Sequence, residues 1–227
     1  NDYYLFKDFD KNYSIYGSIY ADYHVPITAE SRPNNTVLYG HNINVGTYFA
    51  KLTRYFPQIN GYGYYSSHPT VQFDTIYEQG AYKIFGAIFI NTQERHGEVY
   101  DYYRKRTFPD KEAFYDFVGN IMDRSVFYTG VDLEYGDEFL TLSTCFYPLG
   151  ENVDTRFVVF ARRVRAGESE EVDVQQYYVN PSPLFFDYWY NVQGGSWQGR
   201  SWDTSKVKGF DEFVAENPDS AIALQGA

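Results

Sequence analysis

Cys145 is the single cysteine of this 227-residue chain, and its thiolate would be the strongest nucleophile that the sequence offers. It ends the segment TLSTC (141–145), which is typical of a buried strand, so the thiol should point toward whatever lies beyond the strand end. A lone cysteine is also common as a small hydrophobic side chain of a core, and that interpretation stays open on this segment alone.

Two further side chains lie at predicted strand ends and could assist a thiolate. His41 follows NTVLYG (35–40), whose glycine frees the backbone, and Arg156 opens the apolar segment RFVVFA (156–161). Taken singly, the first could be an ordinary loop histidine and the second a strand-edge salt bridge. Taken together, a thiol, an imidazole and a guanidinium supply a nucleophile, an acid–base group and a donor for an oxyanion, which suits acyl transfer.

The elements that must position these residues are mostly strands. The aromatic share of 21% favours strands, and strand does not alternate regularly with helix, which argues against a doubly wound parallel sheet. We therefore expect a mostly β chain that forms a closed or nearly closed β-barrel with inserted helices. Strands are predicted at 16–23, 36–40, 70–76, 81–90, 138–144 and 156–165, and helices at 45–56 and 110–124, the second capped by Asp110, with a loop at Gly61 and Gly63.

The chain divides into three parts by composition. Residues 1–15 are a polar and aromatic N-terminal arm, and residues 16–166 are the barrel domain. Residues 167–227, which open with the charged segment GESEEVD (167–173), form a C-terminal extension packed on the barrel. The stretch from Glu216 onward is expected to be poorly ordered.

Charge and motif content exclude several classes of function. The net charge of −11 disfavours nucleic acids and anionic membranes as partners, and a lone cysteine allows no intramolecular disulfide. No run of about 18 apolar residues indicates a membrane span, and no signal peptide is visible at the first residue. The four histidines lack metal-ligand spacing, so no metal or other cofactor is expected. The acidic clusters at 132–138 and 168–173 are typical of solvated turns.

The segments NTVLYGHN (35–42), TLSTC and RFVVFA resemble the His, Cys and Arg motifs of sortases, the cell-surface cysteine transpeptidases of Gram-positive bacteria, and they occur in the same order. TLSTC, the segment YGSIYADY (16–23) and the helix before the Cys strand resemble class B sortases in particular. The resemblance covers roughly residues 10–165 and implies a sortase-like closed β-barrel of about eight strands. The chain departs from class B in a slightly longer Cys–Arg loop and in His24, where relatives often carry Asn.

The resemblance also implies the chemistry. His41, Cys145 and Arg156 would be catalytic, and Ser143 and Thr144 would bind substrate. The enzyme would cleave a sorting signal of the Asn-Pro-x-Thr type through a thioester and join the surface protein to an amino group of a peptidoglycan precursor or cross-bridge. It would work as a monomer at the extracellular face of the cell membrane, held by an N-terminal anchor outside this sequence.

Three other functions are compatible with parts of the sequence. A pilin-polymerising sortase would share the same three motifs. An L,D-transpeptidase also uses Cys, His and Arg, but it places the Arg much closer to the Cys. A non-catalytic cell-wall-binding module would use surface aromatic residues to stack on sugars, with the tryptophans Trp189, Trp197 and Trp202 as candidates.

Overall fold

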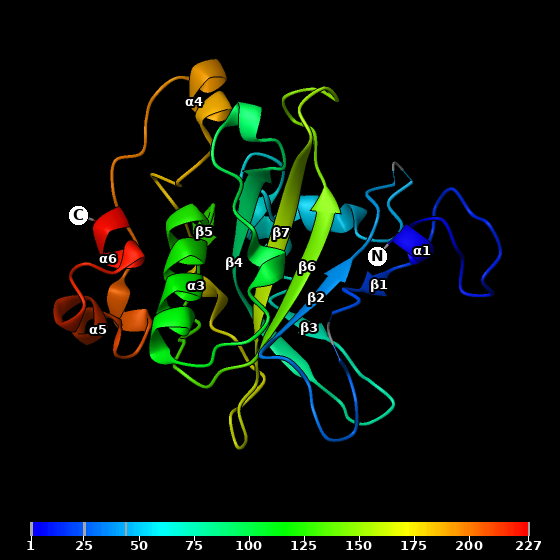
Figure 1. Cartoon of the computed structure of the whole chain (residues 1–227), viewed down its shortest axis with the longest axis horizontal. Coiled ribbons are helices and arrows are strands. Elements are labelled where there is room, and N and C mark those ends of the chain that lie inside the picture. Colours follow the sequence, from blue (N-terminus) through cyan, green and yellow to red (C-terminus); the bar gives the residue numbers. More distant parts are fainter. Residues whose placement is uncertain (1, 25, 44, 227) are drawn as a thin grey trace.

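A computed structural model describes residues 2–24, 26–43 and 45–226, and a curled six-stranded sheet lies at its centre (Figure 1). Within these ranges the strand order is β1-β2-β6-β7-β4-β3, and a separate pair joins β5 to β8. The strands are β1 (Tyr20–Ala21), β2 (Asn35–Tyr39), β3 (Thr70–Gln72), β4 (Ala81–Asn91), β5 (Phe127–Tyr128), β6 (Phe139–Cys145), β7 (Thr155–Arg163) and β8 (Tyr178–Val179).

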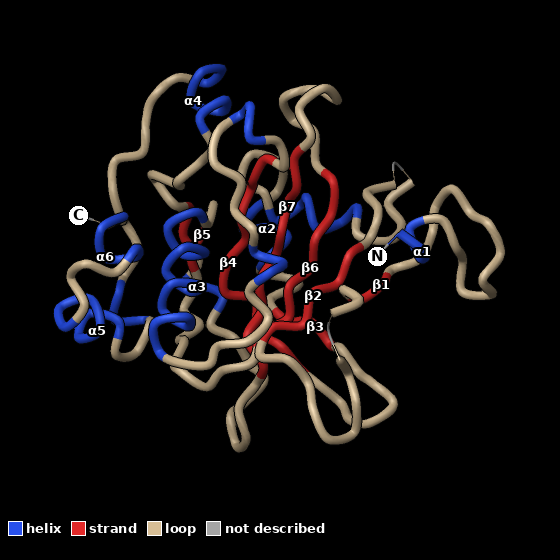
Figure 2. The backbone as a smooth tube through the Cα atoms, viewed as in Figure 1, coloured by secondary structure: helices blue, strands red, loops and turns tan. Residues whose placement is uncertain are grey.

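Helices surround this sheet, and most of the remaining chain is loop (Figure 2). The α-helices are α1 (Asp2–Leu5), α2 (Gly61–Tyr65), α3 (Lys111–Arg124), α4 (Asp187–Gln193), α5 (Phe210–Glu216) and α6 (Ala221–Gln225). The 3-10 helices are Ala50–Tyr55, Glu94–His96, Tyr102–Arg104, Val174–Gln176 and Thr204–Lys206. None of the described helices is both long enough and apolar enough to cross a membrane.

The strand directions bring the ends of β2, β6 and β7 together. β2 and β6 pair in parallel, so the chain leaves both strands at the same end of the sheet. β7 pairs with β6 in the antiparallel sense and starts at that end. The end of β2, the end of β6 and the start of β7 therefore lie side by side, although β2 and β7 are more than a hundred residues apart in the sequence.

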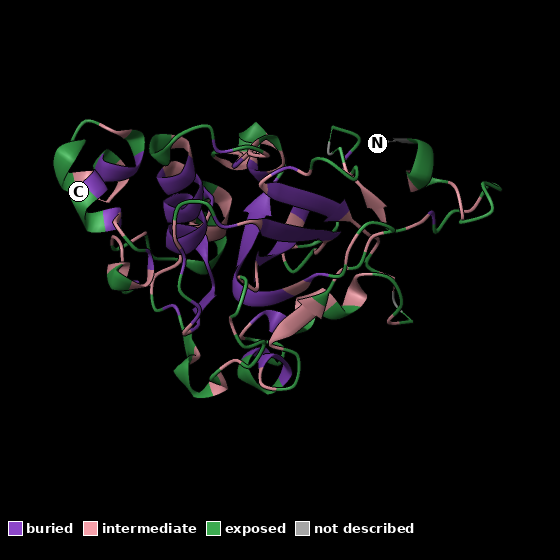
Figure 3. Ribbon diagram, turned by 90° about the horizontal axis from the view of Figure 1, so that it is seen from below, coloured by how far each residue is buried: buried purple, intermediate pink, exposed green. Residues whose placement is uncertain are grey.

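The core lies on both faces of the sheet, which Figure 3 shows as buried together with α3. Consecutive residues of a strand point to opposite faces, so Phe139 and Phe160 pack toward α3 while Leu140 and Phe157 pack on the other face. β4 is buried along almost its whole length because both of its faces are covered. A rigid core of this kind fixes the strand ends that carry the polar side chains.

β2, β4, β6, β7 and α3 agree with the sequence prediction, including the Asp110 cap, whose carboxylate accepts a 2.9 Å hydrogen bond from the Ala113 amide. The strands predicted at 16–23 and 70–76 are much shorter, as β1 and β3, and the pair of β5 and β8 was not predicted. The sheet is less closed than a full barrel, since β1 and β3 are its edges among the described residues. The helix predicted at 45–56 was wrong in extent. Gly46 and Tyr48 have positive φ angles of 83° and 56°, which interrupt a helical backbone, so only a short 3-10 helix forms.

Two further predictions were wrong. The loop expected around Gly61 and Gly63 is the helix α2, whose buried face carries Tyr64 and Tyr65 into the core. The end of the chain is also folded, since α6 packs against α3 and buries Ile222 at 1% exposure. Tertiary packing against an aromatic core orders segments whose own composition suggested a loop or a loose end.

Residues 167–226 run along the side of the sheet and around α3 (Figure 1). The carboxylate of Asp123, on α3, accepts hydrogen bonds from Arg200, Trp202 and Gln225 at 2.6 to 2.9 Å. Residue 1 of the expected N-terminal arm lies outside the described residues. The rest of the arm forms α1 and a turn that returns to it, where the Ser18 amide donates to the Tyr4 carbonyl oxygen at 3.0 Å.

Candidate active site

A pocket of about 270 Å³ lies where β2 and β6 end and β7 begins. The three side chains that the sequence singles out, His41, Cys145 and Arg156, all line it. The other lining residues are Leu5, Tyr20, Tyr39, Gly40, Ser143 and Thr144. The structure therefore brings a thiol, an imidazole and a guanidinium to one peptide-sized hollow, as the strand-end positions predicted.

Cys145 and Arg156 are directly opposite each other in the β6–β7 pair. Side chains of opposite residues point to the same face of a sheet, with Cβ atoms about 5 Å apart. Cys145 is a free cysteine of intermediate exposure, so its thiol is not enclosed in the core. The side-chain amide of Asn42 donates a 2.9 Å hydrogen bond to the Cys145 carbonyl oxygen, which ties the loop carrying His41 to the cysteine strand.

Arg156 is held by an ion pair with Asp154, whose carboxylate accepts hydrogen bonds from Nη1 at 2.5 Å and from Nη2 at 3.3 Å. Burial alone would lower the pKa of Arg156. The hydrogen bond to Asp154 and the electrostatic interaction with Cys145 outweigh it and raise the pKa above its ordinary value. The guanidinium is therefore a fixed positive charge beside the thiol.

His41 contacts the N-terminal helix. Its Nε2 lies 3.3 Å from the carbonyl oxygen of Leu5, and a carbonyl oxygen only accepts, so Nε2 carries a hydrogen in this arrangement. Leu5 also lines the pocket. The arm thus forms part of the site wall, which its sequence did not indicate because it has no periodicity and no motif.

Ser143 and Thr144 line the same pocket, but their hydroxyl groups are already bound within the protein. The Oγ of Ser143 accepts a 2.7 Å hydrogen bond from the Tyr102 hydroxyl, and the Oγ1 of Thr144 donates a 2.7 Å hydrogen bond to the Gly40 carbonyl oxygen. The structure therefore gives both residues a positioning contact, and their contact with substrate stays a prediction.

Several tyrosines of the site were missed by the sequence reasoning. Burial raises the pKa of Tyr102 to about 12, and burial together with the adjacent Tyr102 and Asp22 raises that of Tyr39. Tyr147 follows Cys145 by two positions, and burial and the Cys145 thiol raise its pKa. These hydroxyls are neutral near pH 7 and can donate hydrogen bonds. Of these tyrosines, only Tyr39 lies within a motif that the sequence analysis singled out, the segment that contains His41.

A second cavity of about 270 Å³ adjoins the first, and the two share Tyr39 and Arg156 in their walls. Its other walls come from the end of β4 and from the loop that leads to α3, including Tyr100, Tyr102 and Tyr103. Arg156 is thus reachable from both sides.

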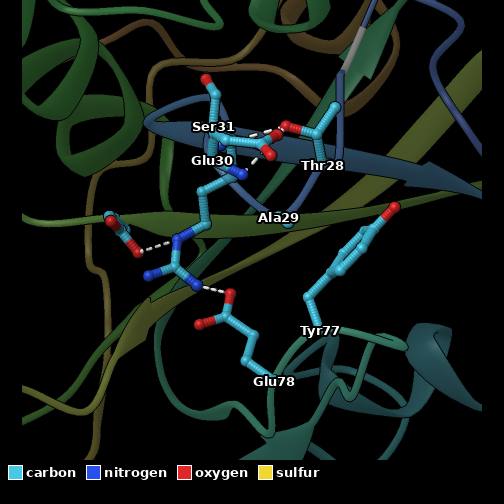
Figure 4. Close-up of a pocket in the computed structure, with 8 residues that line it drawn as sticks. Thr28, Ala29, Glu30, Ser31, Tyr77 and Glu78 are labelled. Atoms are coloured by element: carbon cyan, nitrogen blue, oxygen red, sulfur yellow. Dashed lines mark hydrogen bonds and ion pairs between the residues drawn. The ribbon is translucent and has the colours of Figure 1, made fainter.

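A further pocket, of about 370 Å³, lies at the opposite end of the sheet, where β2 and β6 begin. Ion pairs from Arg32 to Glu78 and Glu138 run along its wall (Figure 4). Arg163 pairs with the same two glutamates at 2.9 and 3.2 Å. Because these charges compensate one another, the pocket offers a ligand no unbalanced charge from this cluster.

Two of the three tryptophans that were candidates for sugar stacking are engaged within the protein. Trp202 is buried at 5% exposure and donates a hydrogen bond to Asp123. Trp189 packs on Phe89 and Phe185 with ring centroids 5.3 and 4.7 Å apart. Over the residues that the structure covers, no three His, Cys, Asp or Glu side chains are grouped to hold a metal ion.

Comparison with known proteins gives consistent results. A family model described as the Sortase domain matches residues 11–164. "Sortase B" of Listeria monocytogenes serovar 1/2a (strain ATCC BAA-679 / EGD-e) is 31% identical over 145 residues, which are 64% of this chain and 54% of that protein. "Sortase B" of Staphylococcus aureus (strain NCTC 8325 / PS 47) is 28% identical over 162 residues, 71% of this chain and 61% of that protein. The chain thus spans less than two thirds of the length of these relatives.

Solved structures show the same relationship. A Staphylococcus aureus sortase B–substrate complex superposes with a TM-score of 0.62 at 28% identity, covering 74% of this chain and 71% of that one. A Clostridium perfringens sortase B gives a TM-score of 0.60 at 26% identity, covering 73% and 82%. The family model covers the strands that carry His41, Cys145 and Arg156. This chain belongs to the sortase family, and within that family to class B.

Proposed function

We propose that this chain is a cysteine transpeptidase that cleaves a sorting signal of the Asn-Pro-x-Thr type and transfers the acyl part to an amino group of peptidoglycan. The observation that carries the proposal is the single pocket lined by His41, Cys145 and Arg156. A nucleophile, an acid–base group and a fixed cation are what acyl transfer through a thioester requires.

In the first half-reaction, the Cys145 thiolate attacks the carbonyl carbon after the threonine of the signal. The carbonyl oxygen becomes an oxyanion, which Arg156 stabilises by donating hydrogen bonds. The carbon–nitrogen bond then breaks, and the His41 imidazolium gives its proton to the departing amine. The product is a thioester between the Cys145 sulfur and the threonine acyl group.

In the second half-reaction, the acceptor amine attacks the thioester carbon and neutral His41 takes its proton. The carbon–sulfur bond breaks, the thiolate of Cys145 is restored, and a new amide bond joins the two partners. His41 therefore gives a proton in one step and takes one in the next. A solved sortase B complexed with triglycine, a peptide with a free amino group, supports an amine as the acceptor.

The substrate class is supported by a neighbouring structure, the Staphylococcus aureus sortase B–substrate complex. The position of the enzyme at the extracellular face of the membrane, with its anchor outside this sequence, is part of the same proposal. The wall-binding module is disfavoured because Trp202 is buried and Trp189 packs within the protein. A pilin polymerase would use the same site with a protein amine as acceptor, and an acceptor comparison separates the two.

The test is to incubate the protein with an Asn-Pro-x-Thr peptide, without acceptor, and to measure its intact mass. We expect an acyl adduct on wild-type protein, its loss on adding a glycine-peptide amine, and no adduct on Cys145→Ala. Because the chain has one cysteine, the adduct needs no further site assignment. If folded wild-type protein gives no adduct with any peptide of this type, the proposal is wrong.

A further inference from the structure

Asp154 and Arg156 form a clamp beside the pocket. The two carboxylate oxygens of Asp154 accept from the two terminal nitrogens of Arg156, Oδ1 from Nη1 at 2.5 Å and Oδ2 from Nη2 at 3.3 Å. Nη1 donates a second hydrogen bond to the Thr155 carbonyl oxygen at 2.9 Å. The end of the guanidinium is therefore fixed at three points. Such end-on pairing sets the direction of the whole planar group.

The clamp is attached to the central sheet. The Thr92 side chain, which follows the end of β4, donates to the Oδ2 of Asp154 at 2.6 Å, and the Thr92 amide donates to the Asp154 carbonyl oxygen at 3.0 Å. Partial burial would raise the pKa of Asp154. The hydrogen bonds from Arg156 and Thr92 outweigh it and lower the pKa, so the carboxylate stays ionised. Asp154 is thus anchored independently of the residue that it holds.

The donors of Arg156 can be counted. A guanidinium has five N–H groups, and three of them are used by Asp154 and Thr155. Among the described residues, no other group accepts a hydrogen bond from Arg156, so Nε–H and the second hydrogen of Nη2 stay available. These two lie on the same edge of the planar group and form a parallel fork. Arg156 lines both adjoining cavities, so its side chain borders the space in which a peptide would bind.

We propose that Asp154 is a positioning residue, which holds the far end of Arg156 so that the free Nε/Nη2 edge receives the carbonyl oxygen of the acyl group as it becomes an oxyanion. The proposal rests on the proposed function and adds to it a named residue and a named pair of donors. A donor edge fixed before the reaction stabilises the oxyanion without reorganisation. Removal of the clamp should therefore affect the chemical step more than peptide binding.

The test is steady-state cleavage of the Asn-Pro-x-Thr peptide by the wild type, Asp154→Asn, Arg156→Ala and the double variant. For Asp154→Asn we expect kcat to fall about 10- to 100-fold while KM changes by less than about twofold. In the Arg156→Ala background the same substitution should have almost no further effect, because the group that it positions is gone. Glu151→Gln removes one negative charge from the same loop without touching the clamp and should match the wild type.

The outcomes separate the two proposals. A wild type that never acylates Cys145 overturns the proposed function and this inference with it. A wild type that is active, with an Asp154→Asn variant of unchanged kcat, overturns only the role of Asp154. Equal losses in the wild-type and Arg156→Ala backgrounds would show a general structural role and would also overturn it. Thermal melting of each variant shows whether a loss of activity is caused by misfolding. Thr92→Val is a milder control, because it removes one hydrogen bond to the Asp154 carboxylate and leaves the carboxylate in place.

Discussion

Single residues at the strand ends serve the fold and the site at once. Gly40 directly follows β2 and lies beside the end of β6, the parallel strand that carries Ser143 and Thr144. The Thr144 hydroxyl donates to the Gly40 carbonyl oxygen, and the Gly40 amide donates to the Ser143 carbonyl oxygen. Gly40 directly precedes His41, and Thr144 directly precedes Cys145. These hydrogen bonds tie together the two backbone segments that carry His41 and Cys145.

Thr144→Val tests this linkage, since valine keeps the shape of the side chain and removes its hydroxyl. The Gly40 carbonyl oxygen would lose a partner in a partly buried place, which costs about 1 to 2 kcal/mol of unfolding free energy. We expect that loss in urea unfolding, together with a lower kcat for peptide cleavage, whereas Thr144→Ser should stay close to the wild type. A stable Thr144→Val variant with only a raised KM would instead indicate the direct substrate contact that the family resemblance implies.

At the scale of elements, the N-terminal arm forms part of the wall of the pocket. α1 reaches the site through the Leu5 carbonyl oxygen, which accepts from His41, and the arm is held in place by the turn at Gly17. Gly17 has a φ of 53°, and a Cβ there would collide with the carbonyl oxygens of Tyr4 and Leu5. The arm can therefore stay on His41 only with glycine at this position.

Gly17→Ala is expected to displace α1 and open the pocket. Loss of a hydrogen bond worth about 1 kcal/mol shifts the population by about fivefold, so a bulky maleimide should label Cys145 about fivefold faster. Gly136→Ala is the matched control, because Gly136 also has a positive φ, of 106°, but a Cβ there meets no atom within 4 Å. Equal labelling rates for both variants and the wild type would show that the arm does not cover the thiol.

At the scale of the whole molecule, local sequence patterns predicted the main strands and the long helix. The contacts between segments that are distant in the sequence could not be predicted in this way. The apolar run of β4 and the periodicity of α3 are local signals, and strand-end positions were enough to group His41, Cys145 and Arg156. The contact of Leu5 with His41 and the Arg156 clamp depend on how distant or irregular segments fold, which no periodicity records. Residues 167–227 carry no strong motif either, yet they bury Trp202 and Ile222 against the α3 side of the core.

The acidic clusters at 132–138 and 168–173 were predicted to be solvated turns, and this was wrong for several of their residues. Their partners lie on distant strands, which the local sequence does not show. Arg162, on β7, has a fully buried side chain, and its two terminal nitrogens donate to Glu168 at 2.7 Å. Lys83, on β4, also binds Glu168 at 2.7 Å, and Asp137 is buried and paired with Arg165. A buried cation needs such a partner, so Glu168, in the first residues of the extension, compensates the charges of Arg162 and Lys83 on the sheet.

This arrangement predicts how stability depends on pH. The hydrogen bonds from Arg162 are the largest effect on the pKa of Glu168 and lower it; burial opposes them, and the hydrogen bond from Lys83 adds to the lowering, so the pKa lies far below its ordinary value. A carboxyl group whose pKa is depressed by folding contributes its full stability above its unfolded pKa of about 4.3, and that contribution is lost as the pH falls toward the folded value. The wild type should therefore lose unfolding free energy between about pH 5 and pH 3.

Glu168→Gln should be less stable at pH 7 by about 3 kcal/mol, because Arg162 stays buried with less compensating charge, and its stability should fall less steeply below pH 5. Urea unfolding from pH 3 to pH 7 measures both effects. Glu171→Gln, an exposed neighbour in the same segment, should follow the wild-type curve. Parallel curves for the wild type and Glu168→Gln would mean that the acid sensitivity arises elsewhere in the molecule, and that residues 167–173 are attached to the sheet by packing alone.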